Sequence, residues 1–402
     1  MFGRTVGALA AVLVAVGALA VFNFARPVGA VAASPLKPDV ARVPGTAPTI
    51  AWPSGAASAI ALPELGSLGS HGDSSPQPMA SIAKVMTALV VLKGHPLTLT
   101  QPGDVVMVTG EDVAEFEREQ AAGQSVVPVQ QGEALGERQL LEGMLIPSGN
   151  NLANLLARWD SGSIEAFVAK MNDLAAALGM RRSHFADPSG FSAQTVGTPA
   201  DLILAGEALM AQPVLAQIVS EAQVDLPVAG TVYNVDYALG RRGIVGIKTG
   251  SAPKAGACFL FAAATRVGGR QVIVFGAVMG EPTLDDAFAA GEALIGSVLP
   301  GLQLVPVVSA SEAVAEYRAP WGSRTGLVAA KDISLVSWPG LLLHRRVDAP
   351  AATAPLADGA EAGALSAWIG SGAPQSVPLV TDGPLYAPGN FWRLTRPFSD
   401  SR

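Results

Sequence analysis

The 402-residue chain has a single cysteine, four histidines and few charged residues, which make up 15% of the sequence. One cysteine excludes an intrachain disulfide. Cys258 lies in the apolar run 257–261, which predicts a core strand rather than a reactive site. The histidines are scattered, without the i, i+4 pairing or neighbouring cysteines of a zinc site. We therefore expect no metal site and no other cofactor.

Positive charge is also scarce, since 26 lysines and arginines face 33 acidic residues and the formal net charge is −7. No basic stripe interrupts this acidic balance, so the composition excludes a general nucleic-acid-binding protein. Half of the residues are hydrophobic. A chain of this length and composition can bury the cores of two domains, one of them large.

The N-terminus carries the longest apolar run of the chain. Residues 5–22 contain no charge, Arg4 precedes them, and the first acidic residue is Asp39. This pattern predicts an export signal, and it just reaches the length that spans a membrane. Residues 30–32 (Ala-Val-Ala) offer a cleavage site. We expect segment 1–25 to be a membrane anchor, which we favour, or a removed signal, with the rest of the chain outside the cytoplasm.

Composition changes divide the remaining chain into three parts. Residues 26–48 contain five prolines and predict a tether without a core of its own. Residues 49–300 combine two early strands, amphipathic helices and a late run of strands, which predicts an α+β domain with an antiparallel sheet and a helical subdomain. Within it, the acidic stretch 111–119 is interpreted as a solvated face. Residues 301–402 predict a small, mostly β domain.

Three short motifs in the α+β domain could supply acyl-transfer chemistry. Ser81 and Lys84 open a predicted helix over 81–93, which places a hydroxyl and an amine on one helical face. Ser148-Gly149-Asn150 follows a helix that ends at Pro147, on a turn predicted to be exposed. Lys248-Thr249-Gly250 closes a strand. Each motif alone also has an ordinary structural explanation as a helix cap, a polar turn or a strand end.

The order and setting of these motifs match the signature of penicillin-binding proteins and serine β-lactamases. Residues 49–300 resemble the low-molecular-mass penicillin-binding proteins that act as D-alanyl-D-alanine carboxypeptidases. The segments that carry this resemblance further are 78–87, 139–151, 184–190 and 246–250. The resemblance implies a penicillin-interactive fold like that of serine β-lactamases and transpeptidases.

The resemblance also implies roles for the motif residues in acyl transfer. Ser81 would be the nucleophile, and Lys84 its base if a second cation, Lys248, helps to keep it neutral. Ser148 would relay the proton to the leaving amine, and Asn150 would hydrogen-bond the amide backbone of the substrate.

Four further positions would hold the substrate. Lys248 and Thr249 would bind the terminal carboxylate of a D-Ala-D-Ala peptide or of a penicillin. Gly250 would allow the substrate to approach the strand edge closely. The backbone N–H groups of Ser81 and Ser251 would form the oxyanion hole.

These roles predict a serine D,D-carboxypeptidase that trims peptidoglycan stem pentapeptides and is acylated by β-lactams. Within the same fold, a β-lactamase or a D,D-endopeptidase is an alternative, and a different class is a penicillin-binding sensor or scaffold without turnover. A β-lactamase usually carries a deacylating glutamate after the second motif. Glu165 is the nearest candidate, but its place behind the capping residue Ser163 favours a structural use.

Overall fold

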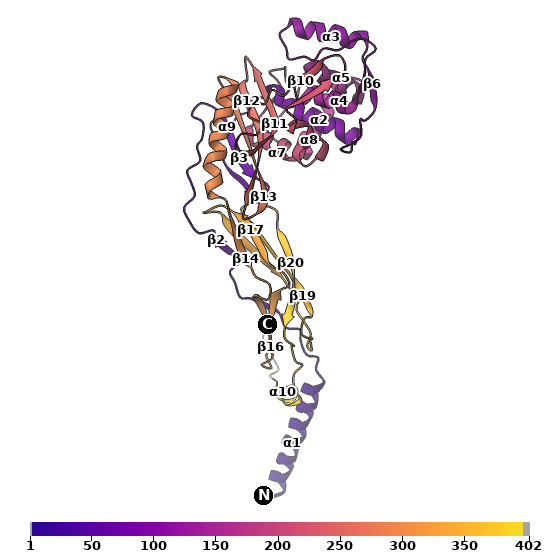
Figure 1. The fold of residues 1–402 in the computed structure, drawn as a ribbon. Helices are drawn as coiled ribbons and strands as arrows, with labels where there is room; N and C mark the ends of the chain where they lie inside the picture. The colour runs from indigo at the N-terminus through magenta and orange to yellow at the C-terminus, as the bar shows by residue number, and fades with distance from the viewer. Residues whose placement is uncertain (1, 397–402) are drawn as a thin grey trace. The chain divides into compact units, whose positions relative to one another are not determined.

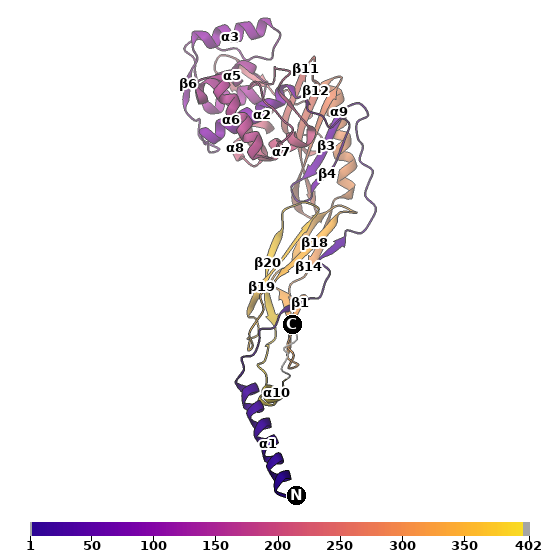
Figure 2. The same cartoon turned by 180° about the vertical axis from the view of Figure 1, so that it is seen from behind.

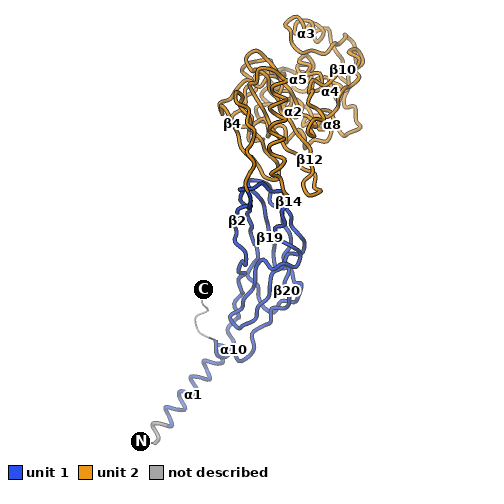
Figure 3. The backbone as a smooth tube through the Cα atoms, turned by 60° about the vertical axis from the view of Figure 1, so that its left-hand side comes forward, with its two compact units in different colours: residues 1–45, 304–402 blue, residues 46–303 orange. Residues whose placement is uncertain are grey.

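The structure is a computed structural model that describes residues 2–396 (Figure 1). Two compact units are present: residues 46–303 form one, and residues 1–45 together with 304–402 form the other (Figure 3). The first combines helices with an antiparallel sheet and the second is rich in β-strands. This architecture confirms the predicted α+β class with an additional β-rich unit.

A five-stranded antiparallel sheet forms one side of unit 46–303, with strand order β11-β12-β13-β3-β4. The turn at Gly268-Gly269 joins two of its long strands, and both glycines have positive φ angles. The sheet carries α9 (Leu284–Val298) on one face (Figure 2). The strand bounds are β3 Ala57–Leu62, β4 Gly66–His71, β11 Ile244–Ala252, β12 Gly256–Val267 and β13 Arg270–Glu281.

The helical part of this unit surrounds α2 (Ala83–Gly94), in which ten consecutive residues from Ala83 to Leu92 are buried. A helix buried on all sides must be apolar nearly throughout, which makes Lys84 an exception that requires an explanation. Ser163 and Thr198 cap the following helices by accepting hydrogen bonds from backbone N–H groups, as their sequence patterns predict. The helices around α2 are α4 Glu137–Leu145, α5 Asn150–Ser161, α6 Ile164–Ala177, α7 Pro199–Met210 and α8 Pro213–Ser220. Ser163 precedes α6, and Thr198 precedes α7.

The acidic stretch 111–119 differs from its prediction as a solvated face. It forms α3 (Gly110–Ala121), and Asp112 and Glu119 are buried. Arg158 of α5 donates hydrogen bonds to Asp112 and Glu115, at 2.7 and 2.6 Å. Asp112, Glu115 and Glu119 therefore dock α3 onto α5, while Glu111 and Glu117 are exposed. Short two-stranded ribbons complete the unit: β5 Gln77–Pro78 with β8 Val196–Gly197, β6 Val105–Met107 with β7 Ala134–Gly136, and β9 Gln223–Leu226 with β10 Gly230–Tyr233.

The second unit is built on a seven-stranded sheet with strand order β1-β15-β16-β20-β19-β18-β2. Its outer strands, β1 (Ala33–Pro35) and β2 (Val40–Arg42), come from the segment that was predicted to be a tether without a core. That prediction was wrong for these residues because prolines are compatible with edge strands, where a missing N–H costs no ladder bond. The other strands are β14 Gln303–Val308, β15 Ala313–Arg318, β16 Arg324–Ala329, β17 Ile333–Ser337, β18 Leu342–Asp348, β19 Glu361–Ile369 and β20 Gln375–Asp382, with β14 pairing to β17.

The same unit contains two terminal helices that contact each other, α1 (Phe2–Ala25) and α10 (Asn390–Thr395). Within the described residues, Val6–Ala25 is one helix that is long and apolar enough to cross a membrane, with a mean hydropathy of 2.4. Length and composition are the basis of this assignment, and they suit a signal sequence equally.

Candidate active site

Ser81 lies in a short 3₁₀ turn, Ala80–Ile82, that leads directly into α2. The preceding Ala80 has a φ angle of +49°, an uncommon conformation for a residue with a Cβ atom. This turn leaves Ser81 partly exposed while Lys84, three residues later, is completely buried. The predicted pair therefore lies on one face, with the hydroxyl at the surface and the amine beneath it.

The amine of Lys84 is surrounded by polar oxygen atoms. Its Nζ lies 2.7 Å from Ser81 Oγ and 3.4 Å from Ser148 Oγ. It donates hydrogen bonds to Asn150 Oδ1 at 2.6 Å and to the carbonyl oxygen of Ser189 at 3.2 Å. The last two atoms can only accept, so a neutral amine can donate both N–H groups to them and keep its lone pair for the Ser81 hydroxyl.

Burial is the main reason for Lys84 to lose its proton. Desolvation lowers the pKa of Lys84 well below the ordinary lysine value, and the positive charge of Lys248 lowers it further. Asp187 and Glu119 act in the opposite direction. The effect expected of Lys248 is therefore present, but desolvation is the larger cause.

Lys248 is itself buried, on strand β11, and burial lowers its pKa to about 7. The buried carboxylate of Asp236 opposes this shift. Burial also raises the pKa of Asp236 to about 6, against the influence of a backbone hydrogen bond and of Lys248. A negatively charged group that enters the site would favour the charged form of Lys248.

The second motif connects the helices α4 and α5. Ser148 has a φ angle of +70°, and such strain in a residue with a Cβ atom often marks a functional site. The turn was predicted to be exposed, but Ser148 and Asn150 are each 5% exposed. The residues around 125–127 cover it, since Asn150 N donates to the Ser125 carbonyl. Packing explains why position 149 is a glycine, because a Cβ atom there would lie 2.9 Å from the Gly143 carbonyl oxygen.

Strand β11 brings the third motif against the serine turn. A Cβ atom on Gly250 would lie 2.9 Å from the backbone nitrogen of Ser81, so glycine allows this close approach. Ser251 follows on the same strand and is exposed, whereas Thr249 is buried beside Lys248. The structure thus brings all three motifs to one place.

A loop over residues 185–191 supplies contacts to which the sequence alone gave no role. The carbonyl of Ser189 accepts from Lys84, and Asp187 organises the loop by accepting from Ser189 Oγ and from the backbone N–H of Phe191. Gly190 has a φ angle of +80°, and a Cβ atom there would lie only 1.8 Å from the Ala80 carbonyl oxygen. The family-like segment 184–190 was the available signal for this loop.

An open cleft of about 590 Å³ gives access to Ser81. Gln124 also lines it, and the Asn150 side chain donates a 2.6 Å hydrogen bond to the Gln124 side-chain oxygen. No motif in the sequence pointed to Gln124. The other lining residues are Pro78, Ala80, Ala122, Gly123, Ser125, Gly190, Phe191, Ser192, Ala193 and 251–255.

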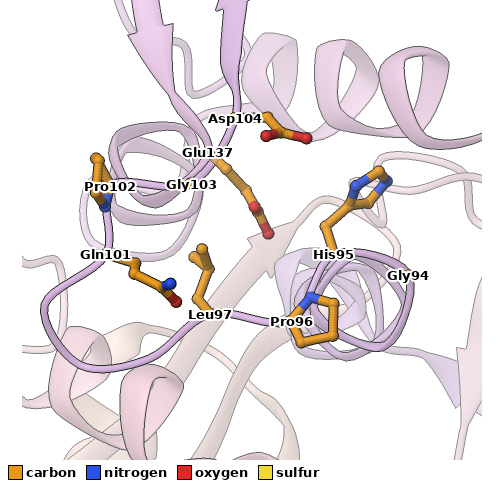
Figure 4. A pocket seen from close by; sticks show the side chains of 9 residues that line it. All are labelled: Gly94, His95, Pro96, Leu97, Gln101, Pro102, Gly103, Asp104 and Glu137. Carbon is orange, nitrogen blue, oxygen red and sulfur yellow. The ribbon is translucent and has the colours of Figure 1, made fainter.

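A second cavity, of about 510 Å³, lies between the end of α2 and the start of α4 (Figure 4). Its polar side chains include Asp104, His95 and Glu137, which is 1% exposed. Burial and the Asp104 charge raise the pKa of Glu137 to about 7. Among the described residues that line this cavity, none is a serine, cysteine or lysine.

The chain is similar to known proteins over the unit that contains this site. The family described as peptidase S11, D-alanyl-D-alanine carboxypeptidase, matches residues 68–283. The D-alanyl-D-alanine carboxypeptidase DacB2 of Mycobacterium tuberculosis is 36% identical over 204 residues, which cover 49% of this chain and 65% of that protein. The match thus spans just under two thirds of that relative's length.

Two solved structures are similar to the chain. The Streptomyces K15 DD-transpeptidase has a TM-score of 0.56 and 26% identity, and the match covers 64% of this chain and 100% of that one. DacD from Francisella tularensis, a D-alanyl-D-alanine carboxypeptidase, has a TM-score of 0.61 and 19% identity and covers 85% of this chain and 96% of that one. At that identity the second similarity shows the fold alone. Together they confirm the predicted penicillin-interactive fold.

Proposed function

Because this chain belongs to the peptidase S11 family of D-alanyl-D-alanine carboxypeptidases, we propose that it removes the terminal D-alanine from peptidoglycan stem pentapeptides. The observation that carries the proposal is the buried Lys84 amine, 2.7 Å from Ser81 Oγ and with a lowered pKa. A lysine whose pKa is lowered by burial is neutral over a wider pH range than an ordinary lysine, and a serine needs a neutral base to become a nucleophile.

The proposed acylation step uses Lys84 and the two hydroxyl groups beside it, those of Ser81 and Ser148. Neutral Lys84 takes the Ser81 proton while Ser81 Oγ attacks the carbonyl carbon of the peptide bond between the two D-alanines. The backbone N–H groups of Ser81 and Ser251 would stabilise the oxyanion. As the C–N bond breaks, the proton passes from Lys84 through Ser148 to the nitrogen of the departing D-alanine. Water then hydrolyses the acyl-serine ester and regenerates the Ser81 hydroxyl.

Substrate recognition would rest on the carboxylate of the terminal D-alanine. Lys248 and Thr249 are proposed to bind it, and the charge of Lys248 would then be stabilised by its partner. The close approach of Gly250 to Ser81 supports a substrate that lies along the edge of β11. A β-lactam presents an equivalent carboxylate and acyl carbon, so β-lactams are proposed as covalent inhibitors.

Incubation of the protein with a peptide that ends in D-Ala-D-Ala tests this function directly. We expect release of free D-alanine and slow loss of a covalently bound fluorescent penicillin. Glu165 is exposed and lies outside the residues that line the cleft, which supports slow hydrolysis of the penicilloyl ester. Rapid penicillin hydrolysis would indicate a β-lactamase instead, stable acylation without D-alanine release a sensor, and cleavage of cross-linked dimers alone an endopeptidase.

We further propose that α1 remains attached and anchors the protein at the outer face of the cytoplasmic membrane. The end of α1 is integrated into its unit: the Arg396 side chain, 2% exposed, donates to the carbonyl oxygens of Asn23 and Pro27. Val31, in the predicted cleavage site, is buried and exchanges two backbone hydrogen bonds with Ala352. An enzyme that removes signal sequences can cleave only an accessible segment. This packing therefore supports retention of α1.

Fractionation and intact-mass measurement test the anchor in an expressing bacterium. We expect the protein to sediment with membranes, to resist extraction at high salt, and to have a mass that includes residues 1–32. A variant without residues 2–22 serves as the control and should fail to reach the membrane fraction. A soluble exported form that begins after residue 32 would contradict the proposal.

A further inference from the structure

The carboxamide of Asn150 is engaged at both of its ends. Its oxygen accepts a hydrogen bond from Lys84 at 2.6 Å, and its nitrogen donates to Gln124 Oε1 at 2.6 Å. The first contact fixes which end of the amide faces Lys84, because only the oxygen can accept from the amine. The amide nitrogen must then point away from Lys84, toward the cleft that Gln124 lines. Of the two N–H groups on this nitrogen, the one directed at Gln124 on the cleft wall is therefore already in use.

Gln124 has a fixed backbone, whereas its side chain is held only by its contact with Asn150 among the described residues. Its backbone N–H donates to the Glu119 carbonyl oxygen at 3.0 Å, and the next residue, Ser125, is held by the backbone N–H of Asn150. Within the described part of the chain, the hydrogen bond from Asn150 is the one that its side chain makes. Gln124 is partly exposed at the cleft wall. If this one hydrogen bond breaks, a change of rotamer is enough to turn the Gln124 side chain into solvent.

We infer that the Gln124 carboxamide occupies the place of the substrate's backbone carbonyl in the free enzyme and is displaced when the peptide binds. A primary carboxamide has the same acceptor as a peptide bond, so it satisfies the Asn150 donor in the same way. The inference rests on the proposed function, which assigns this donor to the substrate. It adds Gln124 as a residue that competes with the substrate and so sets its affinity.

This role predicts an unusual direction of effect. Removal of a wall residue that only supports Asn150 would weaken catalysis, whereas removal of a competing acceptor leaves Asn150 available to the substrate. The gain is limited by the water that replaces the amide and by the net value of one neutral hydrogen bond. We therefore expect Gln124→Ala to lower KM for the D-Ala-D-Ala peptide about two- to tenfold, with kcat kept within about twofold.

Gln124→Glu should act in the opposite direction. A carboxylate accepts from Asn150 more strongly than an amide oxygen does, because the hydrogen bond is charge-assisted. It would also place a negative charge on the wall through which a peptide carboxylate enters. We expect KM to increase at least about fivefold relative to the wild type at pH 8, where this glutamate is ionised. Gln120→Ala is the matched control, since Gln120 is exposed on the same helix end and should leave KM unchanged.

Steady-state D-alanine release by the full chain and its three variants, with melting temperatures recorded for each, tests the inference. The expected result is a KM that falls in Gln124→Ala and rises in Gln124→Glu at similar melting temperatures. An Ala variant with raised KM or lowered kcat would overturn it, because Gln124 would then position Asn150. An unchanged KM in both variants would also overturn it, leaving a structural contact. Wild-type release of D-alanine tests the proposed function separately, so an active wild type with unresponsive variants refutes this inference alone.

Discussion

Ser81→Ala will abolish covalent labelling by a fluorescent penicillin, with a loss of more than about 10³-fold in acylation rate. The side-chain oxygen of Ser81 is the hydroxyl that lies 2.7 Å from the buried Lys84 amine. Ser148 is farther from that amine, at 3.4 Å, and its strained turn keeps it 5% exposed. The variant retains the cleft and both lysines, so non-covalent binding of the drug remains while the ester does not form.

Labelling is measured by gel fluorescence after denaturation, which removes non-covalent drug. Ser70→Ala is the matched control, because Ser70 is an exposed serine on β4 of the same unit and should label like the wild type. Intact-mass measurement adds a second readout, with the mass of one penicillin in the control and none in Ser81→Ala. Full labelling of Ser81→Ala would assign the nucleophile to another residue, with Ser148 the first to examine.

The sequence was most informative where the chemistry is carried by local patterns. Ser81 and Lys84 are three residues apart on one turn, so their proximity follows from helical geometry. Ser163 caps its helix as predicted, because a cap also depends only on residues nearby in the sequence. The order of the three motifs added long-range information through the family resemblance. Their assembly around Lys84 could then be expected, although the contacts themselves could not.

Contacts between distant segments could not be predicted in this way. The Ser189 carbonyl reaches Lys84 across 105 positions, and a backbone carbonyl has no signature in a sequence. Gln124 follows the acidic helix α3, and it reaches Asn150 because α3 docks on α5. The charge pattern of α3 resembles that of a surface helix, so the sequence did not indicate this docking. The prolines of 26–48 suggested a tether for a similar reason, since an edge strand tolerates the residues that a linker also contains. In each case the decisive factor was the tertiary partner.

Replacement of Lys84 is expected to have an effect as large as replacement of Ser81. Lys84→Arg places a guanidinium near the serine, and this group stays protonated at any pH at which the protein is folded. Lys84→Met has similar length without a titratable group. Both should lower the acylation rate by about 10³-fold or more, because neither can accept the Ser81 proton. Circular dichroism confirms folding, since Lys84→Met leaves the acceptors on Asn150 and Ser189 without a donor at a cost of ~1–3 kcal/mol.

If the acylation rate of Lys84→Met lies within tenfold of the wild-type rate, another group is the base. Lys93→Met is the matched control, as Lys93 is an exposed lysine at the other end of the same helix. Its acylation rate should equal that of the wild type. Each rate is obtained from the time course of penicillin labelling at saturating drug, so that weaker binding does not imitate slower chemistry.

The pH dependence of acylation separates a proton acceptor from a residue that only orients Ser81. A lysine with the ordinary pKa near 10.4 would be neutral in roughly one molecule in 2,500 at pH 7. Desolvation and Lys248 lower the pKa of Lys84, so the wild-type rate should fall only when the pH drops below this lowered value. Removal of the neighbouring positive charge in Lys248→Met stabilises the protonated form of Lys84, which raises its pKa. The decline should therefore begin at a higher pH in Lys248→Met than in the wild type, and it should be absent from the residual activity of Lys84→Met. A decline at the same pH in the wild type and Lys248→Met would show that the two lysines are not coupled.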